Sequence, residues 1–557
     1  MSSLPSHEAG IDVLASARSH VPRLARGYVD DLTLRRLRRL VWVLVLAIVI
    51  LQLAITFDIS NLAMSTLLLA GNGLGYAYAL RQDLLRRLPV SSLMLLGYTF
   101  SYFTLPPLGQ LLALQPVTHH LIHPVLDEGY ALLGLLALIG GHGLYARSAP
   151  LLALRNALRR HVYARTGFFR EPRLSQLWLM GLLGVVAVVL VRPYAEHAGG
   201  IGHAVLNGLR PFVYVPYILL LLPAWSSRRR VTKGHLVALL PYSVVLVVLA
   251  FITNSRAYLL MGFASLLILY TYLVACGRLR LPRVRPRNVI ALALLVLLVI
   301  GPVTQLAMAM VVVRGLRTEL SPLQLVEQTW RTYRAGGVAE TYAQEMQPAA
   351  LQQAGVGEVY FDNLFLNRLA NLRFVDNAVV NAGQLAGPQR DYFRSIEYGK
   401  VLALMPQPLI DLLGLPVDKA AVTKSSSGDF LLYAATGNSY VVGGFRTGSL
   451  LVNLRLTFGM LWPLLLMVLS AVVFAFVDAW CLVGTDRQTG AWSVRFNPLV
   501  IGMLFTLTFM FTSAATGTES LSSMLAIPLR GWLQLAVLYA IVFWTSRVIT
   551  NVKRGSL

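Results

Sequence analysis

The chain has 557 residues, of which 56% are hydrophobic and 13% are charged, and its mean hydropathy is +0.63. A soluble protein carries about a quarter of charged residues, so this composition excludes a soluble fold and predicts a polytopic membrane protein. The formal net charge of +23 is explained by basic residues that flank apolar spans, because membrane proteins retain Lys and Arg in their cytoplasmic loops. We therefore expect membrane lipids around the chain and no nucleic acid among its partners.

Apolar windows long enough to cross a bilayer as a helix, about 20 residues each, recur along the chain. The predicted fold is therefore all-α, with about 12 transmembrane helices and one large, partly helical extracytoplasmic loop. The predicted spans are residues 40–57, 62–80, 89–108, 129–146, 174–191, 209–225, 236–253, 257–275, 289–313, 456–478, 497–515 and 527–546.

Basic residues are distributed unevenly between the two sets of connecting segments. The set that includes both termini holds 31 Lys and Arg, whereas the short segments of the other set, counted with their flanks, hold only Arg192, Arg210, Arg256 and Arg530. Short loops that remain in the cytoplasm are enriched in basic residues. We therefore expect both termini inside the cell and residues 314–455 outside, where the loop carries 13 Lys and Arg against 12 Asp and Glu.

These boundaries divide the chain into four parts: a basic cytoplasmic tail (1–39), a nine-helix membrane bundle (40–313), an extracytoplasmic loop domain (314–455) and three C-terminal membrane helices with a short cytoplasmic tail (456–557). Within the bundle, residues 151–170 place an apolar stripe opposite arginines, which is typical of an amphipathic helix. It either lies on the inner leaflet or packs under neighbouring spans.

The central parts of the apolar runs hold almost no charged residues, whereas coupling-ion and proton sites in membranes need them. His142 and Asn72 interrupt apolar runs among glycines, which favours close helix packing. The sequence contains no phosphate-binding glycine loop followed by Lys and no spacing of His or Cys typical of zinc. We therefore expect no nucleotide, metal or other cofactor.

Arg256 lies in a tight turn, residues 252–258, between the seventh and eighth predicted spans. An arginine in this position suits two-point binding of phosphate or pyrophosphate. The alternative is an arginine that extends to the head-group level of the bilayer. Both interpretations remain open from the sequence.

Residues 360–381 of the loop read as a helix, with a buried apolar stripe and a second face that carries Asn363, Asn367 and Asn371 beside Arg368. Amides suit sugar hydroxyls, but they also line ordinary solvated faces. Arg373 lies about 140° around the helix from Arg368, so we expect one arginine to be catalytic and the other structural. Asp376 follows Arg373 at i+3, where an ion pair forms on a helix.

A glycine-rich stretch, residues 436–449, contains Arg446 and precedes the tenth predicted span. Backbone amides of such a stretch are able to cradle an anion. A flexible connection is the alternative.

Taken together, these features resemble the bacterial oligosaccharide repeat-unit polymerases of the O-antigen polymerase type. The resemblance covers most of the chain in architecture, and in residues it rests on the Thr-Asn-Ser-Arg-Ala turn at 253–257 and on Thr-Phe-Gly at 457–459. The related O-antigen ligases carry a functional histidine in their large external loop. No histidine occurs within 314–455 here, which favours the polymerase over the ligase.

The resemblance implies an enzyme of the bacterial inner membrane that moves a growing glycan from undecaprenyl pyrophosphate to a lipid-linked repeat unit on the periplasmic face. It also implies a flippase and a chain-length regulator as partners. Arginines would stabilise the leaving pyrophosphate, and Asp362 or Asp376 would take the hydroxyl proton. The expected catalytic residues are Arg256, Arg368, Arg373 and Asp376; the expected substrate-binding residues are Arg314, Arg317, Arg446, Asn363, Asn367, Asn371 and Asp362.

Three alternatives remain open from the sequence. One is a ligase-like or other lipid-linked glycosyltransferase, although the first external loop offers only Asp58 to a metal. A flippase for lipid-linked oligosaccharides shares the substrate but does not need a loop of this size. The third is a non-enzymatic assembly protein that uses the loop as a docking surface.

Overall fold

The computed structural model describes residues 30–191, 201–222, 231–253, 257–279, 320–337, 371–485, 492–513 and 518–555, with isolated positions between 287 and 313. Over these residues the chain is mostly helical, and one two-stranded antiparallel hairpin is present. Its strands are β1 (Cys481–Thr485) and β2 (Trp492–Phe496), paired in a register that sets Val483 opposite Val494.

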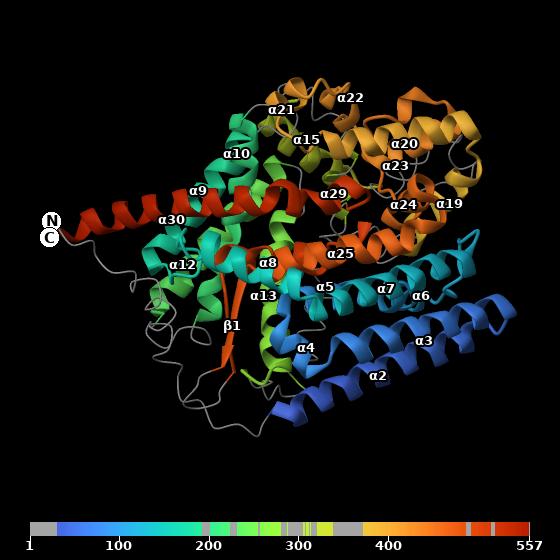
Figure 1. Cartoon of the computed structure of the whole chain (residues 1–557), viewed down its shortest axis with the longest axis horizontal. Helices are drawn as coiled ribbons and strands as arrows, with labels where there is room; N and C mark the ends of the chain where they lie inside the picture. The colour runs from blue at the N-terminus through green and yellow to red at the C-terminus, as the bar shows by residue number, and fades with distance from the viewer. Residues whose placement is uncertain are drawn as a thin grey trace.

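The N-terminal part forms much of a helical bundle, coloured from blue to green in Figure 1. Its helices are α2 (Asp30–Ile55), α3 (Ile59–Ala79), α4 (Gln82–Arg87), α5 (Pro89–Thr99), η1 (Phe100–Thr104), α6 (Leu105–Leu112), α7 (Pro124–Arg147), α8 (Ala149–Ala157), η2 (Leu158–Tyr163), α9 (Leu174–Leu190), α10 (Ile201–Leu209), η3 (Arg210–Leu220), α12 (Lys233–Ile252) and α13 (Ala257–Ala275).

The predicted loop region forms shorter helices, and the C-terminal part returns to the bundle. The loop region holds α15 (Pro322–Ala335), α19 (Asn371–Gly383), α20 (Gly387–Leu402), α21 (Gln407–Leu412), α22 (Lys419–Thr423), α23 (Ser427–Thr436) and η5 (Ser439–Val441). The C-terminal part holds α24 (Leu450–Phe458), η6 (Gly459–Leu461), α25 (Trp462–Asp478), α26 (Pro498–Gly502), α27 (Leu504–Thr508), α29 (Leu521–Ala526), η7 (Ile527–Gly531) and α30 (Trp532–Gly555).

Five helices in the described part of the chain are long and apolar enough to cross a membrane: Thr33–Ile55, Pro124–Arg147, Lys233–Phe251, Leu450–Asp478 and Leu521–Asn551. Three shorter apolar helices accompany them. On α2, Leu40, Val43 and Ile50 are more than 60% exposed, as expected of side chains that face lipid. An all-α membrane protein is therefore confirmed in class, whereas the number of twelve spans and the orientation remain predictions.

Two predicted spans differ from the helices observed. The span predicted at 456–478 starts earlier, in α24, and is interrupted at Gly459, whose φ of 63° is the left-handed region that glycine adopts without strain. The span predicted at 497–515 is not one continuous helix in the residues described, because α26 and α27 are each five residues long and meet at Met503.

Polar residues inside the bundle serve close packing, as the sequence predicted for Asn72 and His142. The Asn72 amide donates to the carbonyl of Phe103 at 2.8 Å. The buried His142 ring lies 3.0 Å from Ser91 Oγ and 3.1 Å from Tyr78 Oη. Next to it, a Cβ added to Gly141 would lie 2.2 Å from Ser470 Oγ, so only glycine permits this contact between α7 and α25.

The amphipathic segment 151–170 packs against the bundle rather than only against lipid. It forms α8, η2 and a following turn, in which Leu158, Tyr163 and Phe168 are buried. Trp480 Nε1 donates to Tyr163 Oη at 2.7 Å, and Arg159 donates to the carbonyl of Asp478 at 2.7 Å. The alternative of packing under neighbouring helices is therefore the observed one.

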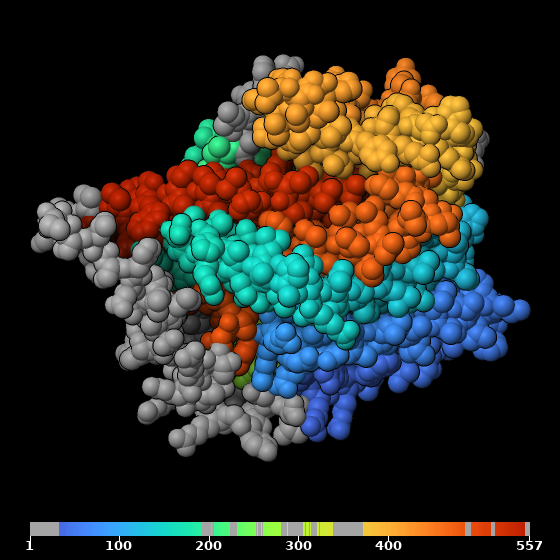
Figure 2. Space-filling view, in the orientation of Figure 1, coloured from blue at the N-terminus to red at the C-terminus, as the bar shows by residue number. Residues whose placement is uncertain are grey.

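Helices α19 to α23 lie together on one edge of the bundle, and we call them the cap. Figure 2 shows the cap, coloured yellow to orange, above α25 and α30. Helix α19 contacts α7 and α24, and α20 contacts α24 and α29. The cap thus brings polar loop residues against α7 and against α29, which begins the long apolar helix Leu521–Asn551.

Candidate functional site

Several predicted site residues lie outside the described residues. These are Arg256, Arg314, Arg317, Asp362, Asn363, Asn367 and Arg368. The structure describes the other four: Asn371, Arg373 and Asp376 on α19, and Arg446 before α24.

Helix α19 is buried on every side over its first two turns. All residues from Asn371 to Ala378 are buried, although the sequence predicted an apolar stripe and a separate polar face. For Asn371 that prediction is wrong. Its side chain hydrogen-bonds to Tyr102, because α19 lies between α7, α24 and α23 rather than on the surface of the cap.

Arg373 and Asp376 form the i+3 ion pair that the sequence predicted. Arg373 Nη1 lies 2.8 Å from Asp376 Oδ2 and also donates to the carbonyl of His120. Asp376 accepts further hydrogen bonds from the backbone amides of Ile122, at 3.0 Å, and His123, at 2.9 Å. His123 is the residue that precedes α7, so this pair fastens α19 to the start of that helix.

The contacts of Asp376 suit a carboxylate that holds α19 in place better than a general base that takes a proton from substrate. Both of its oxygens accept hydrogen bonds, three donors converge on them, and the side chain is fully buried. These donors, the Arg373 guanidinium and the amides of Ile122 and His123, fix the carboxylate between α19 and the start of α7. Asp376 is therefore suited to positioning α19.

Asp127 and Glu128, in the first two turns of α7, were not predicted as site residues, because the sequence placed the start of this span at residue 129. Both side chains are 0% exposed. Neither carboxyl receives a hydrogen bond from any donor in the part of the chain that the structure describes. Asp376 lies near this end of α7, because it accepts from the amide of His123 and α19 packs against α7. We call Asp127, Glu128, Arg373 and Asp376 the α7 cluster.

A signal for these residues was present in the spacing of the glycines. Asp127, Gly134 and Gly141 are seven residues apart, about two helical turns, and so share one face of α7. A Cβ at Gly134 would lie 2.3 Å from Tyr98 Oη, which shows how tightly this face is packed. A carboxyl group two turns from a glycine contact is therefore expected to be buried with it.

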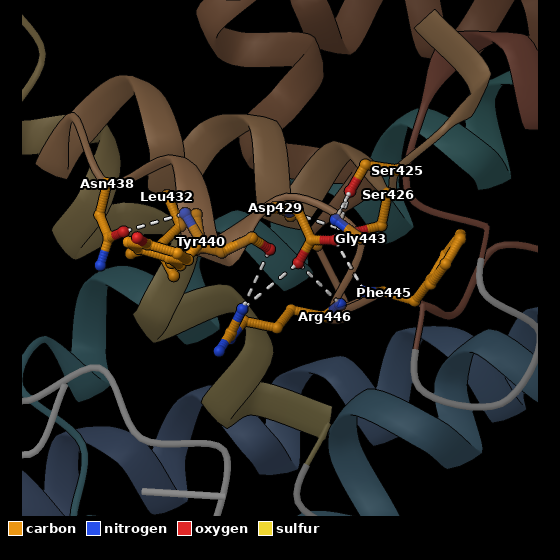
Figure 3. Close-up of polar contacts among 12 residues, drawn as sticks. Ser425, Ser426, Asp429, Leu432, Asn438, Tyr440, Gly443, Phe445 and Arg446 are labelled. Atoms are coloured by element: carbon orange, nitrogen blue, oxygen red, sulfur yellow. Dashed lines mark hydrogen bonds and ion pairs between the residues drawn. The ribbon is translucent and has the colours of Figure 1, made fainter. Parts of the chain in front are cut away.

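Arg446 belongs to an ordered loop that folds around Asp429 (Figure 3). Asp429 accepts from the amides of Phe445, at 2.7 Å, and Arg446, at 3.0 Å, and from Ser425 Oγ, at 2.5 Å. The Arg446 guanidinium lies 3.6 Å from the same carboxylate. The predicted flexible connection is therefore wrong for this loop.

One amide of the glycine-rich loop and two amides at the start of α23 bind an anion, but the anion belongs to the chain itself. Glu519 accepts from the amides of Ser427 and Gly448, both at 2.7 Å, and from Gly428 at 3.4 Å. Glu519 lies two residues before α29. Its carboxylate thus joins the N-terminus of α23 to the last long helix of the bundle.

Next to Glu519, two further charged residues are buried between α20 and α23. Ser427 Oγ donates to Glu397 at 2.5 Å and accepts from Lys400 Nζ at 2.9 Å. Burial raises the pKa of Glu397 to about 7, against the opposing effect of the Lys400 ammonium. Burial also raises the pKa of Glu519 and lowers the pKa of Lys400. We call Glu397, Lys400 and Glu519 the Glu519 cluster.

Comparison of the chain with protein-family models, with curated proteins and with solved structures finds no match. Among the described residues, no group of three His, Cys, Asp or Glu side chains is arranged to hold a metal ion. A function for the chain is therefore inferred from its membrane bundle, its cap and the two clusters.

Proposed function

We propose that the chain is a glycosyltransferase of the oligosaccharide repeat-unit polymerase type. It would move a growing glycan from undecaprenyl pyrophosphate to a lipid-linked repeat unit at the periplasmic face of the bacterial inner membrane. The observation that supports this most is the contact of the cap with the first turns of α7, where Arg373 and carboxyl groups meet at an apolar bundle. A lipid-linked sugar needs such a boundary, because its tail lies in the bilayer and its glycan outside.

The reaction requires two kinds of protein side chain, cations and a carboxylate. A hydroxyl of the acceptor sugar attacks the anomeric carbon of the donor, the bond from that carbon to pyrophosphate breaks, and the pyrophosphate leaves with the electron pair. Fixed cations stabilise the charge that develops on the leaving group, and a carboxylate accepts the hydroxyl proton. The donor is already activated, so neither a nucleotide nor a metal is required.

We assign the roles accordingly. Arg256 and Arg368 would bind the leaving pyrophosphate, with Arg314 and Arg317 beside them, and Asp362 would be the base. The row Asn363 and Asn367 would bind sugar hydroxyls. Arg373, Asp376, Asn371 and Arg446 would hold the cap in place, since each is bound to other groups of the chain.

The second candidate is a flippase for the same lipid-linked units, and the buried carboxyls of Asp127 and Glu128 favour it. Ionisable side chains inside a membrane bundle are typical of proton-coupled transport. A ligase-like transferase is disfavoured, because the loop region lacks the histidine of that family.

Reconstitution of the purified chain in liposomes with one lipid-linked repeat unit distinguishes the candidates. In the presence of EDTA and without nucleotide, a polymerase gives a ladder of products that differ by one repeat unit. A flippase instead makes the unit accessible to a glycan-cleaving enzyme on the opposite side and gives no ladder. Absence of a ladder from a well-folded protein would refute the proposed function.

A further inference from the structure

Helix α30 carries an exposed apolar stripe. Its five members are between 40% and 62% exposed: Leu533, Val537, Ile541, Trp544 and Val548. They follow one another at intervals of three or four residues, so they share one face of the helix. Because α30 belongs to an apolar helix long enough to cross a membrane, Leu521–Asn551, this stripe is suited to contact with lipid tails.

Two arginines contact Trp544, near the C-terminal end of the stripe. The guanidinium carbon of Arg170 lies 5.1 Å from the centre of a Trp544 ring, and that of Arg547 lies 5.4 Å from it. The aromatic ring attracts each cation. Because both guanidiniums lie over one side chain, their like charges are close together and repel each other. An anion beside them would relieve that repulsion.

A third arginine lies one turn further along α30. The Arg173 guanidinium donates to Asn551 Oδ1, and Asn551 follows Arg547 at i+4, on the same side of the helix. The side-chain amide of Gln176, in the first turn of α9, donates to the carbonyl of Phe543 at 3.2 Å. The segment that carries Arg170 and Arg173 is therefore fastened to α30, and contacts within the chain position the three guanidiniums.

The two segments that form this cluster carry a large excess of positive charge. Residues 164–173 and 544–555 contain six Lys and Arg, whereas Glu171 is their one acidic residue. None of the ion pairs among the residues that the structure describes includes Arg170, Arg173 or Arg547. The cluster therefore suits an anion from outside the chain.

We propose that Arg170, Arg173 and Arg547 bind the phosphate of one anionic phospholipid, whose acyl chains lie along the stripe of α30. Arginine suits this ligand, because its planar guanidinium makes two-point contacts with phosphate oxygens. Tryptophan is enriched at the head-group level of membranes, which is where Trp544 would then lie. The apolar stripe beside the cations favours a lipid over a soluble anion. This inference does not depend on the proposed function.

The affinity for single lipids, measured by native mass spectrometry, tests the proposal. The full chain, purified in a neutral detergent, is titrated with phosphatidylglycerol or with phosphatidylcholine of the same acyl chains. Each titration is repeated with an excess of inorganic phosphate.

The site variant is Arg170→Gln with Arg547→Gln. The matched control is Arg36→Gln with Arg39→Gln, which removes the same charge from two exposed arginines of α2. Helix α2 lies on the opposite side of the bundle from α30 in Figure 1.

We expect wild type to bind phosphatidylglycerol more tightly than phosphatidylcholine, with or without inorganic phosphate. Each basic residue near an anionic head group contributes about fivefold to binding, so the site variant should lose about twenty-five-fold in affinity for phosphatidylglycerol. The control variant should bind as wild type.

Equal wild-type affinities for the two lipids would overturn the proposal, whether or not the site variant folds. Displacement of phosphatidylglycerol by inorganic phosphate would also overturn it, because the site would then bind a soluble anion. So would a folded site variant that keeps the wild-type preference. An equal loss of affinity in the control variant would show that binding follows net charge and would reject this site.

Discussion

Removing the carboxylate of Asp376 should destabilise the docked cap far more than removing a similar carboxylate at the surface. Asp376→Ala leaves the Arg373 guanidinium buried without its partner, and it leaves the amides of Ile122 and His123 without an acceptor. Breaking a buried pair in this way costs about 3–5 kcal/mol, which at about 1.4 kcal/mol per tenfold is a change of at least a hundredfold in the unfolding equilibrium.

The chain offers a matched control within the cap. Asp391 pairs with Arg394 at 3.2 Å and the same i+3 spacing, but its side chain is 74% exposed. Exposed pairs contribute about 0–1 kcal/mol, so Asp391→Ala should resemble wild type. The assay is unfolding in SDS followed by limited proteolysis of residues 371–436. Equal stability of Asp376→Ala and Asp391→Ala would refute the role of Asp376 as an anchor.

Single residues and single fusion points give three further predictions. Arg256→Ala should abolish polymer while the protein remains abundant in the membrane, and Arg256→Lys should restore little activity because Lys lacks the planar two-point contact; full activity in the Ala variant would leave Arg256 as a head-group anchor. The stability of the cap should fall as the pH rises from about 4.5 to about 7, because the folded chain holds a proton on Glu397 in that range. Glu397→Gln should flatten this slope in SDS unfolding measured across that range, and an unchanged slope would assign it to other groups. A periplasmic reporter fused after residue 340 should be active and one fused after residue 230 should be silent, whereas the reverse result would overturn the predicted orientation.

The sequence was sufficient for the class of fold because hydropathy is a property of each segment alone. Helix α13 has the bounds predicted for that span, residues 257–275. The sequence did not predict where prolines and glycines inside the spans would change or interrupt the helix. Pro216 lies inside the 3-10 helix η3, and Gly459 separates α24 from α25. Such breaks depend on which neighbouring groups satisfy the freed backbone, and no single-segment pattern contains that information.

The candidate site was predictable only where its contacts are local. The pair of Arg373 and Asp376 is three residues apart on one helix, so its spacing revealed it. His123, directly before α7, and Asp376 are far apart in the chain and meet only because α19 packs against α7. The partner of the glycine-rich loop was hidden for the same reason, since Glu519 lies about seventy residues beyond that loop.

The proposed reaction is tested most directly by counting its two products together. Purified protein in liposomes, with EDTA and without nucleotide, receives one lipid-linked repeat unit, and both the new glycosidic linkages and the free undecaprenyl pyrophosphate are quantified. A polymerase releases one lipid pyrophosphate for each linkage formed. Release without linkages would indicate hydrolysis, and the absence of both from folded protein would contradict the assignment.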